Sequence, residues 1–331
     1  MIDRCRRILV IRRDNIGDLL CTTPVLSALR RHYPDARIAC LVNAYNAPVL
    51  QGNPDLDRIY SYTKAKHAPG LPLAHWWREW RVYQRLRRER FDLVIHANPM
   101  PHRRTARLVR YLGGRWRLGV VDPARQADSE AYNIAVSPEE VQGTHHVERV
   151  YSLLRPLGIR DEPGPLVLKV QGKPSSEGDT PILGVHISSR KPCNRWPEPH
   201  FARLIEGLLA EKREVRLFWA PGSQNNPHHP GDDEMAERLA AHFTAGLVPC
   251  ETHTLEALIQ GIAGTDGVIC ADGGALHIAV ALGKPVVGLY GCTDPAVWGP
   301  WQVRSQALRG NGDAASIDPA RVLAAAREVM P

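Results

Sequence analysis

The sequence predicts an α/β protein made of two similar halves, each built on a parallel sheet of the Rossmann type. Short apolar runs typical of buried strands alternate with helical patterns from residue 7 to 157, and the alternation starts again at residue 182. The segment between them, residues 160–181, holds four prolines and three glycines. Such alternation favours parallel strands joined by crossover helices, and the proline-rich segment predicts a linker between two domains.

The length of the chain agrees with this division. Its 331 residues are enough for two domains of ordinary size, and 44% hydrophobic residues can fill a large core in each. We expect an N-terminal domain over residues 1–160, a linker over 161–181 and a second domain over 182–316. We expect the last residues, 317–331, to form a helix that packs back on the N-terminal domain.

Each expected element has a local cause. Apolar runs predict strands at 7–12, 36–42, 58–62, 91–96, 116–121, 182–187, 215–219, 268–271 and 286–290. Periodic apolar positions predict helices at 19–32, 77–90, 104–112, 146–157, 199–212, 233–242, 255–263, 275–282 and 318–330. Pro24 predicts a kink or restart within the first helix, and Gly283 predicts the end of helix 275–282.

One strand–turn–helix–strand unit in the second half, residues 267–299, has the pattern of a ligand loop. Asp272, Gly273 and Gly274 form a tight turn between a strand and a helix. Glycines let a ligand approach the backbone, and the N–H groups at a helix start favour an anion such as a diphosphate. An ordinary βα turn that happens to hold glycines is the alternative, because such turns are common in α/β folds.

Composition argues against several classes of protein. No basic-then-apolar leader precedes the first strand, and no apolar run approaches the roughly 20 residues of a membrane helix, so we expect a cytoplasmic protein. The seven cysteines are scattered without a CxxC pair, which predicts unpaired thiols in a reducing compartment and no zinc site. The His145–His146 and His228–His229 pairs lack further ligands at a recognisable spacing, so we expect no metal.

Positive charge gathers in one part of the chain. The formal net charge is +7, and residues 76–117 hold twelve arginines against three acidic residues. A local basic surface predicts an anionic partner, such as a phosphorylated glycan, a phospholipid surface or a nucleic acid, and a solvated helix is the alternative. Trp77 and Trp80 in this window are expected either in the core or at the level of lipid headgroups.

Three stretches, in order along the chain, together resemble one family. They are ILVIRRDNIGDLLCTTPVLSALRRHYPDARI, GVHISSRKPCNRWPEPHFARLI and DGVICADGGALHIAVALGKPVVGLYGCTDPAVWGP. They resemble glycosyltransferase family 9, the bacterial lipopolysaccharide heptosyltransferases, over nearly the full chain. The resemblance implies a GT-B fold, in which two facing Rossmann-like domains leave a cleft between them. It also implies acceptor binding by the first domain, nucleotide-sugar binding by the second, and inverting transfer without a metal.

Asp18 is the residue that the resemblance implies as the catalytic base. Sugar transfer needs a group that takes the proton from the acceptor hydroxyl, and a carboxylate at the mouth of a strand–loop–helix unit can face a cleft. Capping of the following helix is the alternative role for Asp18. Asp14 is the nearby competitor, and we also expect it to contact the acceptor.

Hydroxyls and cations follow the strand at 182–187 and suit a departing diphosphate. Ser188 and Ser189 can donate to phosphate oxygens, although helix capping is the alternative. The family often has a lysine two residues before the tryptophan of this block, and this sequence has Asn194 there. The cations that we expect to take its place are Arg190, Lys191 and Arg195.

The resemblance implies that the turn at Asp272, Gly273 and Gly274 meets the diphosphate and the donor sugar. Because an aspartate is a poor anion binder, we expect Asp272 to accept hydrogen bonds from sugar hydroxyls or to hold the loop. His277 either reaches the phosphate or bonds to the backbone. We expect His253 near the nucleoside base and Glu234 near the ribose.

The function favoured is transfer of a heptose from ADP-heptose, a co-substrate rather than a cofactor, to a lipopolysaccharide-core or related glycan. The alternatives are a non-catalytic nucleotide-sugar-binding protein and a family member with another sugar or acceptor. A dinucleotide-dependent oxidoreductase is disfavoured, because no GxGxxG follows the first strand.

For an anionic glycolipid acceptor we expect contacts from Asp14, Lys64, Lys66 and Arg81, with the protein at the periphery of the cytoplasmic face of the inner membrane. Nucleic acid is not an expected partner, because no groove-reading motif accompanies the arginines.

Overall fold

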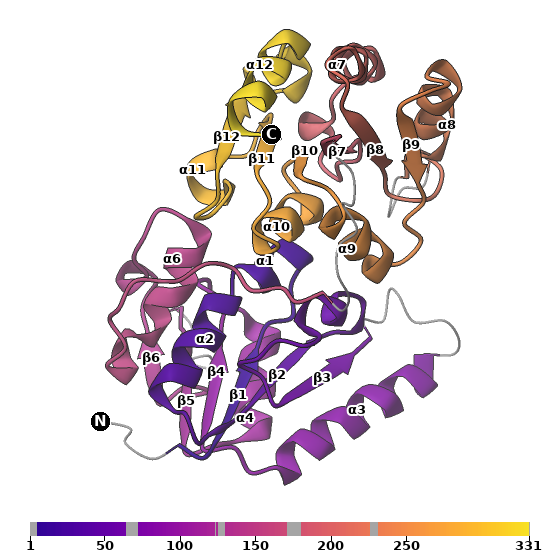
Figure 1. The fold of residues 1–331 in the computed structure, drawn as a ribbon. Coiled ribbons are helices and arrows are strands. Elements are labelled where there is room, and N and C mark those ends of the chain that lie inside the picture. The colour runs from indigo at the N-terminus through magenta and orange to yellow at the C-terminus, as the bar shows by residue number, and fades with distance from the viewer. Residues whose placement is uncertain are drawn as a thin grey trace. The chain divides into compact units, whose positions relative to one another are not determined.

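A computed structural model describes residues 5–63, 72–122, 124, 130–170, 180–225 and 231–330, without the side chains of 72–76. The chain forms two compact units that divide between Val167 and Leu168, inside the expected linker (Figure 1). Two of the residues expected at the acceptor, Lys64 and Lys66, lie outside the described residues.

The first unit is an α/β unit in which helices connect parallel strands. Its strands are β1 (Arg7–Ile11), β2 (Arg37–Asn43), β3 (Arg58–Tyr62), β4 (Leu93–His96), β5 (Trp116–Val120) and β6 (Ile134–Val136). Its α-helices are α1 (Ile16–Leu20), α2 (Thr23–His32), α3 (Pro72–Arg88), α4 (Arg103–Leu112) and α6 (His146–Tyr151). Its 3₁₀ turns are η1 (Ala44–Leu50), η3 (Pro138–Glu140) and η4 (Ser152–Leu157).

The second unit repeats this plan. Its strands are β7 (Ile182–His186), β8 (Glu214–Phe218), β9 (Leu247–Cys250), β10 (Gly267–Ala271), β11 (Val286–Tyr290) and β12 (Ser305–Arg309). Its α-helices are α7 (Glu198–Ala210), α8 (Asp233–His242), α9 (Leu255–Ala263), α10 (Gly274–Ala281), α11 (Pro295–Trp298) and α12 (Pro319–Val329). Its 3₁₀ turns are η5 (Pro192–Asn194) and η6 (Ala314–Ser316).

Both sheets have the doubly wound strand order. The first runs β3-β2-β1-β4-β5-β6 and the second β12-β11-β10-β7-β8-β9, with every pairing parallel. The direction of winding therefore reverses between β1 and β4 and between β7 and β10. Loops on the two sides of such a switch point leave a crevice at the carboxyl ends of the strands, where ligands bind in open α/β sheets. The predicted α/β class with two parallel sheets is confirmed.

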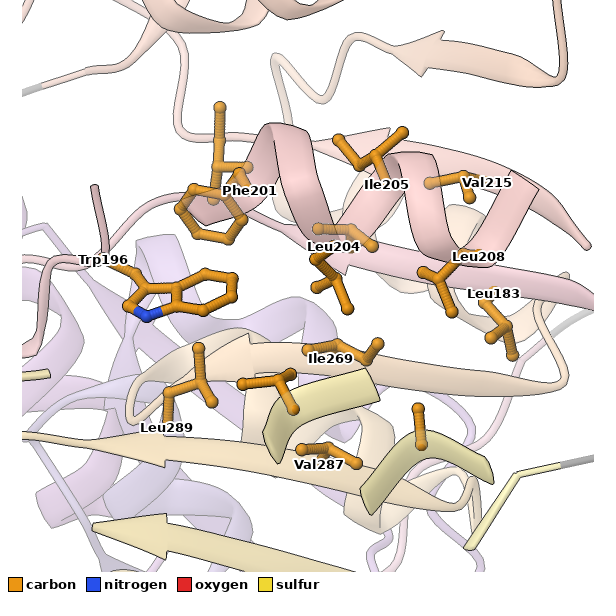
Figure 2. Close-up of a cluster of buried hydrophobic side chains, with 14 of the residues drawn as sticks. Leu183, Trp196, Phe201, Leu204, Ile205, Leu208, Val215, Ile269, Val287 and Leu289 are labelled. Atoms are coloured by element: carbon orange, nitrogen blue, oxygen red, sulfur yellow. The ribbon is translucent and has the colours of Figure 1, made fainter. Parts of the chain in front are cut away.

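Helix α7 covers one face of the second sheet and builds the core there. Phe201, Leu204 and Leu208 project from it onto Ile269 and Val287 of the central strands, and all five side chains are buried (Figure 2). Their spacing along α7 is that of one helical face, which is why this stretch is amphipathic in the sequence. Burial of this face against the strands holds the loops that follow β7, β10 and β11 in place.

Trp196 ties the end of the sequence to this core. Its indole is 2% exposed, packs edge-to-face on Phe201 with ring centroids 4.9 Å apart, and donates a 3.0 Å hydrogen bond from Nε1 to the carbonyl of Ile317. Helix α12, which follows Ile317, packs on α7 and β11 and adds Val322 and Ala326 to the same core. We expected this helix to return to the N-terminal domain, but its buried face belongs to the second unit.

Local sequence predicted the central elements better than the edge ones. The predicted restart at Pro24 is confirmed, because α1 ends at Leu20 and α2 begins at Thr23. The edge strands β6, β9 and β12 were not predicted, since β6 and β9 have only three and four residues and β12 mixes polar with apolar residues. The predicted helix 146–157 changes to a 3₁₀ turn at Ser152, with Pro156 inside the turn.

The expectation that all seven cysteines are unpaired is wrong for one pair. Cys193 and Cys292 form a disulfide across 99 residues, between η5 and the loop after β11. Cys5, Cys21, Cys40, Cys250 and Cys270 take no part in a disulfide. Spacing in the sequence did not indicate this pair, because the two loops meet only when β7 and β11 join one sheet.

The α7 contact predicts a specific loss of stability. Phe201→Ala should lower the free energy of unfolding by about 3–5 kcal/mol, because it leaves a cavity under Trp196. The exposed neighbour Arg203, changed to alanine, should alter it by less than about 0.5 kcal/mol. Urea unfolding of the full chain measures both, and equal effects of the two changes would contradict the packing described.

Candidate active site

The polar residues of interest gather at the two switch points, one in each unit. In the first unit, Arg12 follows β1 and Asn98 follows β4. In the second, Ser188 follows β7 and Asp272 follows β10. Adjacent parallel strands end at the same edge of a sheet, so side chains far apart in the sequence meet there.

Arg12 is the centre of the site in the first unit. Its side chain is 1% exposed, and its terminal nitrogens donate to the carbonyl of Ala97 and, at 2.7 Å, to Oδ1 of Asp18. Its Nε lies 3.2 Å from Oδ2 of Asp14, which also accepts a 3.0 Å hydrogen bond from Asn98. A buried guanidinium is stable only with such partners, because its desolvation is costly. One cation thus orients both carboxylates that we singled out in the sequence.

Asp18 has the capping geometry and also faces the cation. Its Oδ2 accepts hydrogen bonds from the backbone and side chain of Asn15, at 3.2 and 3.1 Å, and so closes a capping box on α1. Its Oδ1 is the partner of Arg12. The side chain remains 16% exposed, so one edge of the carboxylate is open to an incoming group. Capping and a role at the site are therefore compatible in this geometry.

His146, at the start of α6, completes the cluster. Its Nε2 lies 2.9 Å from a terminal nitrogen of Arg12 and 3.4 Å from Oδ1 of Asp18. Nε2 accepts from Arg12 in one tautomer of the neutral imidazole and donates to Asp18 in the other. Burial lowers the pKa of His146, which favours the same neutral form. The sequence drew attention to His146 only as part of a histidine pair, and its contact with Arg12 was not predicted, because 134 residues separate the two and no local pattern links them.

These contacts set the ionisation of Asp18. Burial alone would raise the pKa of its carboxyl, but the contacts with His146 and the charge of Arg12 outweigh burial and hold that pKa well below its ordinary range. Asp18 is therefore a carboxylate at any physiological pH, fixed in orientation by its cap and its cation.

The Arg12–Asp18 pair predicts a non-additive effect on stability. Arg12→Gln should cost about 3–5 kcal/mol at pH 7, because it leaves a buried carboxylate unpaired. The folded-state pKa of Asp18 lies below the unfolded value of about 3.9, so its contribution is present at neutral pH and is lost as pH falls through the lowered pKa. Urea unfolding between pH 7 and pH 3 should show the cost of Arg12→Gln shrinking with acidity.

Two further variants make the test specific. Arg12→Gln with Asp18→Asn should recover most of the loss, since no buried charge is left unpaired. The matched control is Arg13→Gln, because Arg13 stacks 4.2 Å from the ring centroid of Tyr62 and pairs with Glu79 instead of Asp18. An additive double variant would contradict the pairing.

In the second unit, Ser188, Ser189 and Arg195 meet the buried carboxyl of Asp232. Arg195 donates from Nε to the carbonyl of Ser189 at 2.9 Å and from a terminal nitrogen to Oδ1 of Asp232 at 3.1 Å. Ser188 accepts a 2.8 Å hydrogen bond from the N–H of Ala220. Burial raises the pKa of Asp232, although the contact with Ser188 and the charge of Arg195 oppose the rise. Asp232 is a residue of this cluster that the sequence did not indicate.

This cluster contains polar atoms without partners. The second terminal nitrogen of Arg195, the hydroxyl of Ser189 and Oδ2 of Asp232 are buried and make no hydrogen bond within the described structure. Buried polar groups are almost always hydrogen-bonded, so each exception needs an explanation. A nitrogen and a hydroxyl that can both donate fit an anionic ligand such as a phosphate.

Asn194 has a structural position instead of a ligand-facing one. It is fully buried, accepts a 2.9 Å hydrogen bond from the N–H of Gly291, and donates to Thr293 Oγ1 at 3.0 Å and to Asp272 Oδ2 at 3.4 Å. Burial raises the pKa of Asp272, opposed by the hydroxyl of Thr293 and the charge of Lys191. Asn194 therefore holds three loops together, and Arg190 and Lys191 lie exposed on the segment before it.

The glycine turn leaves its backbone accessible. Gly273 is exposed, and a Cβ built there would meet only the carbonyl of Ala271, at 3.9 Å. Gly274 begins α10. His277, one turn into α10, is 3% exposed and lies against the ring of Trp298, so it is a buried side chain of this helix. The open N–H groups of the first turn suit an anion.

A cavity of about 220 Å³ lies beyond the end of β8, between α8 and the segment after β9. Trp219, Asp233, Pro249, Thr252 and His253 are among the residues that line it. His253 is exposed and pairs with Glu251 at 2.9 Å. Glu234 is exposed in the first turn of α8, and its neighbour Asp233 holds the indole of Trp219 through a 2.8 Å hydrogen bond. The cavity is large enough for an aromatic ring system.

Arg81, which we expected at the acceptor, forms no ion pair with Asp14 or Asp18 among the described residues. It lies on the exposed outer face of α3, whereas Glu79, two residues earlier, turns inward to Arg13. The described residues contain no cluster of three or more histidine, cysteine or acidic side chains that could hold a metal ion. No helix within the described ranges is long and apolar enough to cross a membrane.

Two doubly wound units, with a fixed carboxylate in the first and donors without partners in the second, have the architecture of the GT-B fold. Solved structures share this fold. The glycosyl transferase family 9 structure from Veillonella parvula DSM 2008 has a TM-score of 0.83 at 19% identity, covering 99% of this chain and 98% of that one. E. coli heptosyltransferase WaaC with ADP has a TM-score of 0.80 at 22% identity, covering 97% and 99%.

Sequence comparison identifies the family. The model of glycosyltransferase family 9 (heptosyltransferase) matches residues 79–319. Lipopolysaccharide heptosyltransferase 3 of Escherichia coli (strain K12) is 30% identical over 304 residues, 86% of this chain and 82% of that protein. Lipopolysaccharide heptosyltransferase 2 of Salmonella typhimurium is 27% identical, over 92% and 88%. The chain belongs to glycosyltransferase family 9, and the resemblance stated from its motifs is confirmed.

Proposed function

We propose that this protein moves a heptose from ADP-heptose to a lipopolysaccharide-core or related glycan, with inversion and without a metal. It would act on an anionic glycolipid at the periphery of the cytoplasmic face of the inner membrane. The choice of sugar and acceptor is supported by relatives named lipopolysaccharide heptosyltransferases, and the choice of nucleotide by a solved structure of E. coli heptosyltransferase WaaC with ADP. The observation that carries the reaction is Asp18, a carboxylate kept ionised and partly open at the switch point of the first unit.

Asp18 is the general base of this proposal. The acceptor hydroxyl oxygen forms a bond to the anomeric carbon, the bond from that carbon to the diphosphate breaks, and the hydroxyl proton passes to Asp18. A carboxylate with a lowered pKa is a weak base, so the proton moves late, once the attacking oxygen has become acidic. Arg12 and His146 hold the carboxylate of Asp18 in place, and Asp14 is placed to accept a hydrogen bond from another acceptor hydroxyl.

The second unit binds the donor. The unpaired nitrogen of Arg195 and the hydroxyl of Ser189, with Ser188 beside them, donate to diphosphate oxygens. Gly273 and Gly274 offer the N–H groups at the start of α10, and Arg190 adds charge from the exposed loop. Asp272 accepts hydrogen bonds from the sugar hydroxyls.

The nucleoside would occupy the cavity beside α8. Its base lies against Trp219 and His253, and its ribose lies at the first turn of α8, near Glu234. His277 supports α10 from inside the fold and does not contact the donor.

Replacing Asp18 tests the catalytic role. Asp18→Asn keeps the shape of the side chain and removes the base, so turnover with ADP-heptose should fall by about 10²-fold or more. The dissociation constant of ADP should not change, because the donor residues lie in the other unit. Initial rates and calorimetry measure the two quantities.

The control for this experiment is Asp14→Asn, which removes the neighbouring carboxylate. It should raise the acceptor KM and leave most of the turnover. Near-wild-type turnover of Asp18→Asn would sink the base assignment and leave Asp18 as a helix cap alone.

The donor site predicts a difference between nucleotides and nucleosides. Arg195→Gln should weaken ADP binding by about 10-fold or more, because a charge-assisted contact is lost, and leave adenosine binding nearly unchanged. Asp232→Asn in the same chain controls for the carboxyl left without its cation. Thermal shift reads both, and the wild type should respond to ADP more than to UDP, GDP or NAD. Equal losses for ADP and adenosine would refute the phosphate role.

A further inference from the structure

Two tryptophans stand exposed on the first unit. Trp77 and Trp80 of α3 are 61% and 49% exposed, and their rings meet edge-to-face with centroids 5.4 Å apart. Indole rings are ordinarily well buried, so a pair in solvent marks a contact surface more often than a packing role. Of the two places expected for these rings, the structure excludes the core of the unit.

The tryptophans lie opposite the face of α3 that packs on the sheet. Leu86 is fully buried, and Val82 and Tyr83 pack against the core of the first unit. At 100° per residue, Trp77 points to the other side, in line with Arg81 and Arg88 four and eleven positions later, and both arginines are exposed. The outer line of α3 therefore combines an indole with arginines.

Helix α4 continues this surface beside α3 (Figure 1). Gln84 of α3 donates to the hydroxyl of Tyr111 on α4, and Arg87 lies over the same ring at 5.0 Å. Ala106 and Val109 are the buried side of α4. Its exposed side carries Arg103, Arg104, Arg107 and Arg110.

Within the described part of the chain, most of these arginines have no acidic partner. Glu79 turns inward to Arg13, and Arg110 pairs with Glu130 at 2.9 Å. Among the residues that the structure describes, the arginines of α3 and α4 with no acidic group within ion-pair distance are Arg78, Arg81, Arg85, Arg87, Arg88, Arg103, Arg104 and Arg107. A surface helix usually alternates charge, so a row of one sign calls for an anionic partner.

We propose that the outer faces of α3 and α4 bind a bilayer that contains anionic lipids, with Trp77 and Trp80 at the level of the headgroups. Indole prefers that level, because its ring is apolar and its N–H is polar. Each arginine close to an anionic bilayer raises the partition coefficient by about fivefold. The proposal rests on the proposed function in one respect, because the glycolipid acceptor proposed there is what brings the protein to a membrane.

The charge pattern favours a bilayer over a nucleic acid. The two indoles stand at 82° to each other, so successive bases would find no pair of parallel platforms on which to stack. A bilayer needs no such order, because it offers many mobile headgroups to a flat array of cations.

Vesicle flotation of the full chain, without either substrate, tests the surface. The probes are vesicles of phosphatidylcholine alone and of phosphatidylcholine with one third phosphatidylglycerol. The wild type should bind the anionic vesicles, less strongly as salt rises. Arg88→Glu with Arg107→Glu should lower the partition coefficient by at least 20-fold, and Trp77→Ala with Trp80→Ala by at least 10-fold. In addition, brominated lipids should quench the wild type and not the Trp77→Phe, Trp80→Phe variant.

The matched control changes the net charge equally, but on the second unit. Arg203→Glu with Arg321→Glu, on exposed positions of α7 and α12, should retain binding within about threefold. Equal loss in the control would overturn the proposal in favour of unspecific charge, and so would retention of binding by either test variant. Tighter binding of a 20-base-pair duplex than of anionic vesicles, lost in the same variants, would overturn it in favour of nucleic acid.

The same proteins separate this proposal from the proposed function. With a water-soluble, deacylated acceptor, the tryptophan variant should keep the turnover of the wild type, because neither ring touches the site. Loss of vesicle binding with unchanged transfer supports the surface, whereas failure of the wild type to transfer heptose contradicts the function alone.

Discussion

The reversal of winding in each sheet is the constraint on which both sites depend. A parallel strand sends its chain to one face or the other of the sheet, and two neighbouring strands that send it to opposite faces leave a crevice between their loops. In the first unit this happens between β1 and β4, and in the second between β7 and β10. Hence short polar loops directly after those strands can face a ligand while their flanking strands stay fully buried.

The first unit shows what a buried cation adds to such a crevice. Arg12 has almost no exposure, so its charge must be matched within the fold, and Asp18, Asp14 and a backbone carbonyl supply the match. As a result, the pKa of Asp18 is strongly lowered, so its carboxylate is a weaker base but stays charged and fixed in orientation. Such a base suits a reaction in which the acceptor hydroxyl becomes acidic before its proton leaves. Because His146 is neutral, it adds no second positive charge beside the carboxylate of Asp18.

In the second unit, one buried side chain holds the loops together, and neighbouring side chains keep hydrogen-bond donors without a partner. Asn194 uses its amide for Gly291, Thr293 and Asp272, so the neutral side chain joins loops from different strands. Arg195 turns toward Asp232 and keeps one nitrogen unpaired beside the hydroxyl of Ser189. The loops that Asn194 joins fix where these donors point, and the unpaired donors are what an anion would complete. Positive charge at this site thus comes from a residue adjacent to Asn194.

The fold does not require the residues on the outer faces of α3 and α4. Their arginines do not pack in the core, and the strands beneath would pair equally well with other exposed residues on these helices. The inner faces are constrained by packing and the outer faces by solvent alone, so the concentration of one charge and two indoles there requires a cause outside the fold.

The sequence by itself determined the two-sheet α/β class, most central strands and helices, the restart at Pro24, the position of Asp18 in the loop–helix segment after the first strand and that of Asp272 at a strand end. Those features follow from local periodicity, from proline and glycine chemistry and from motif order, all of which depend on residues close together in the sequence. The edge strands β6 and β12, the Cys193–Cys292 pair, the packing of α12 on α7 and the partnership of His146 with Arg12 were decided by tertiary structure alone. Each of these joins residues distant in sequence, and the energy that selects them, burial and charge pairing, exists only after the sheets have formed.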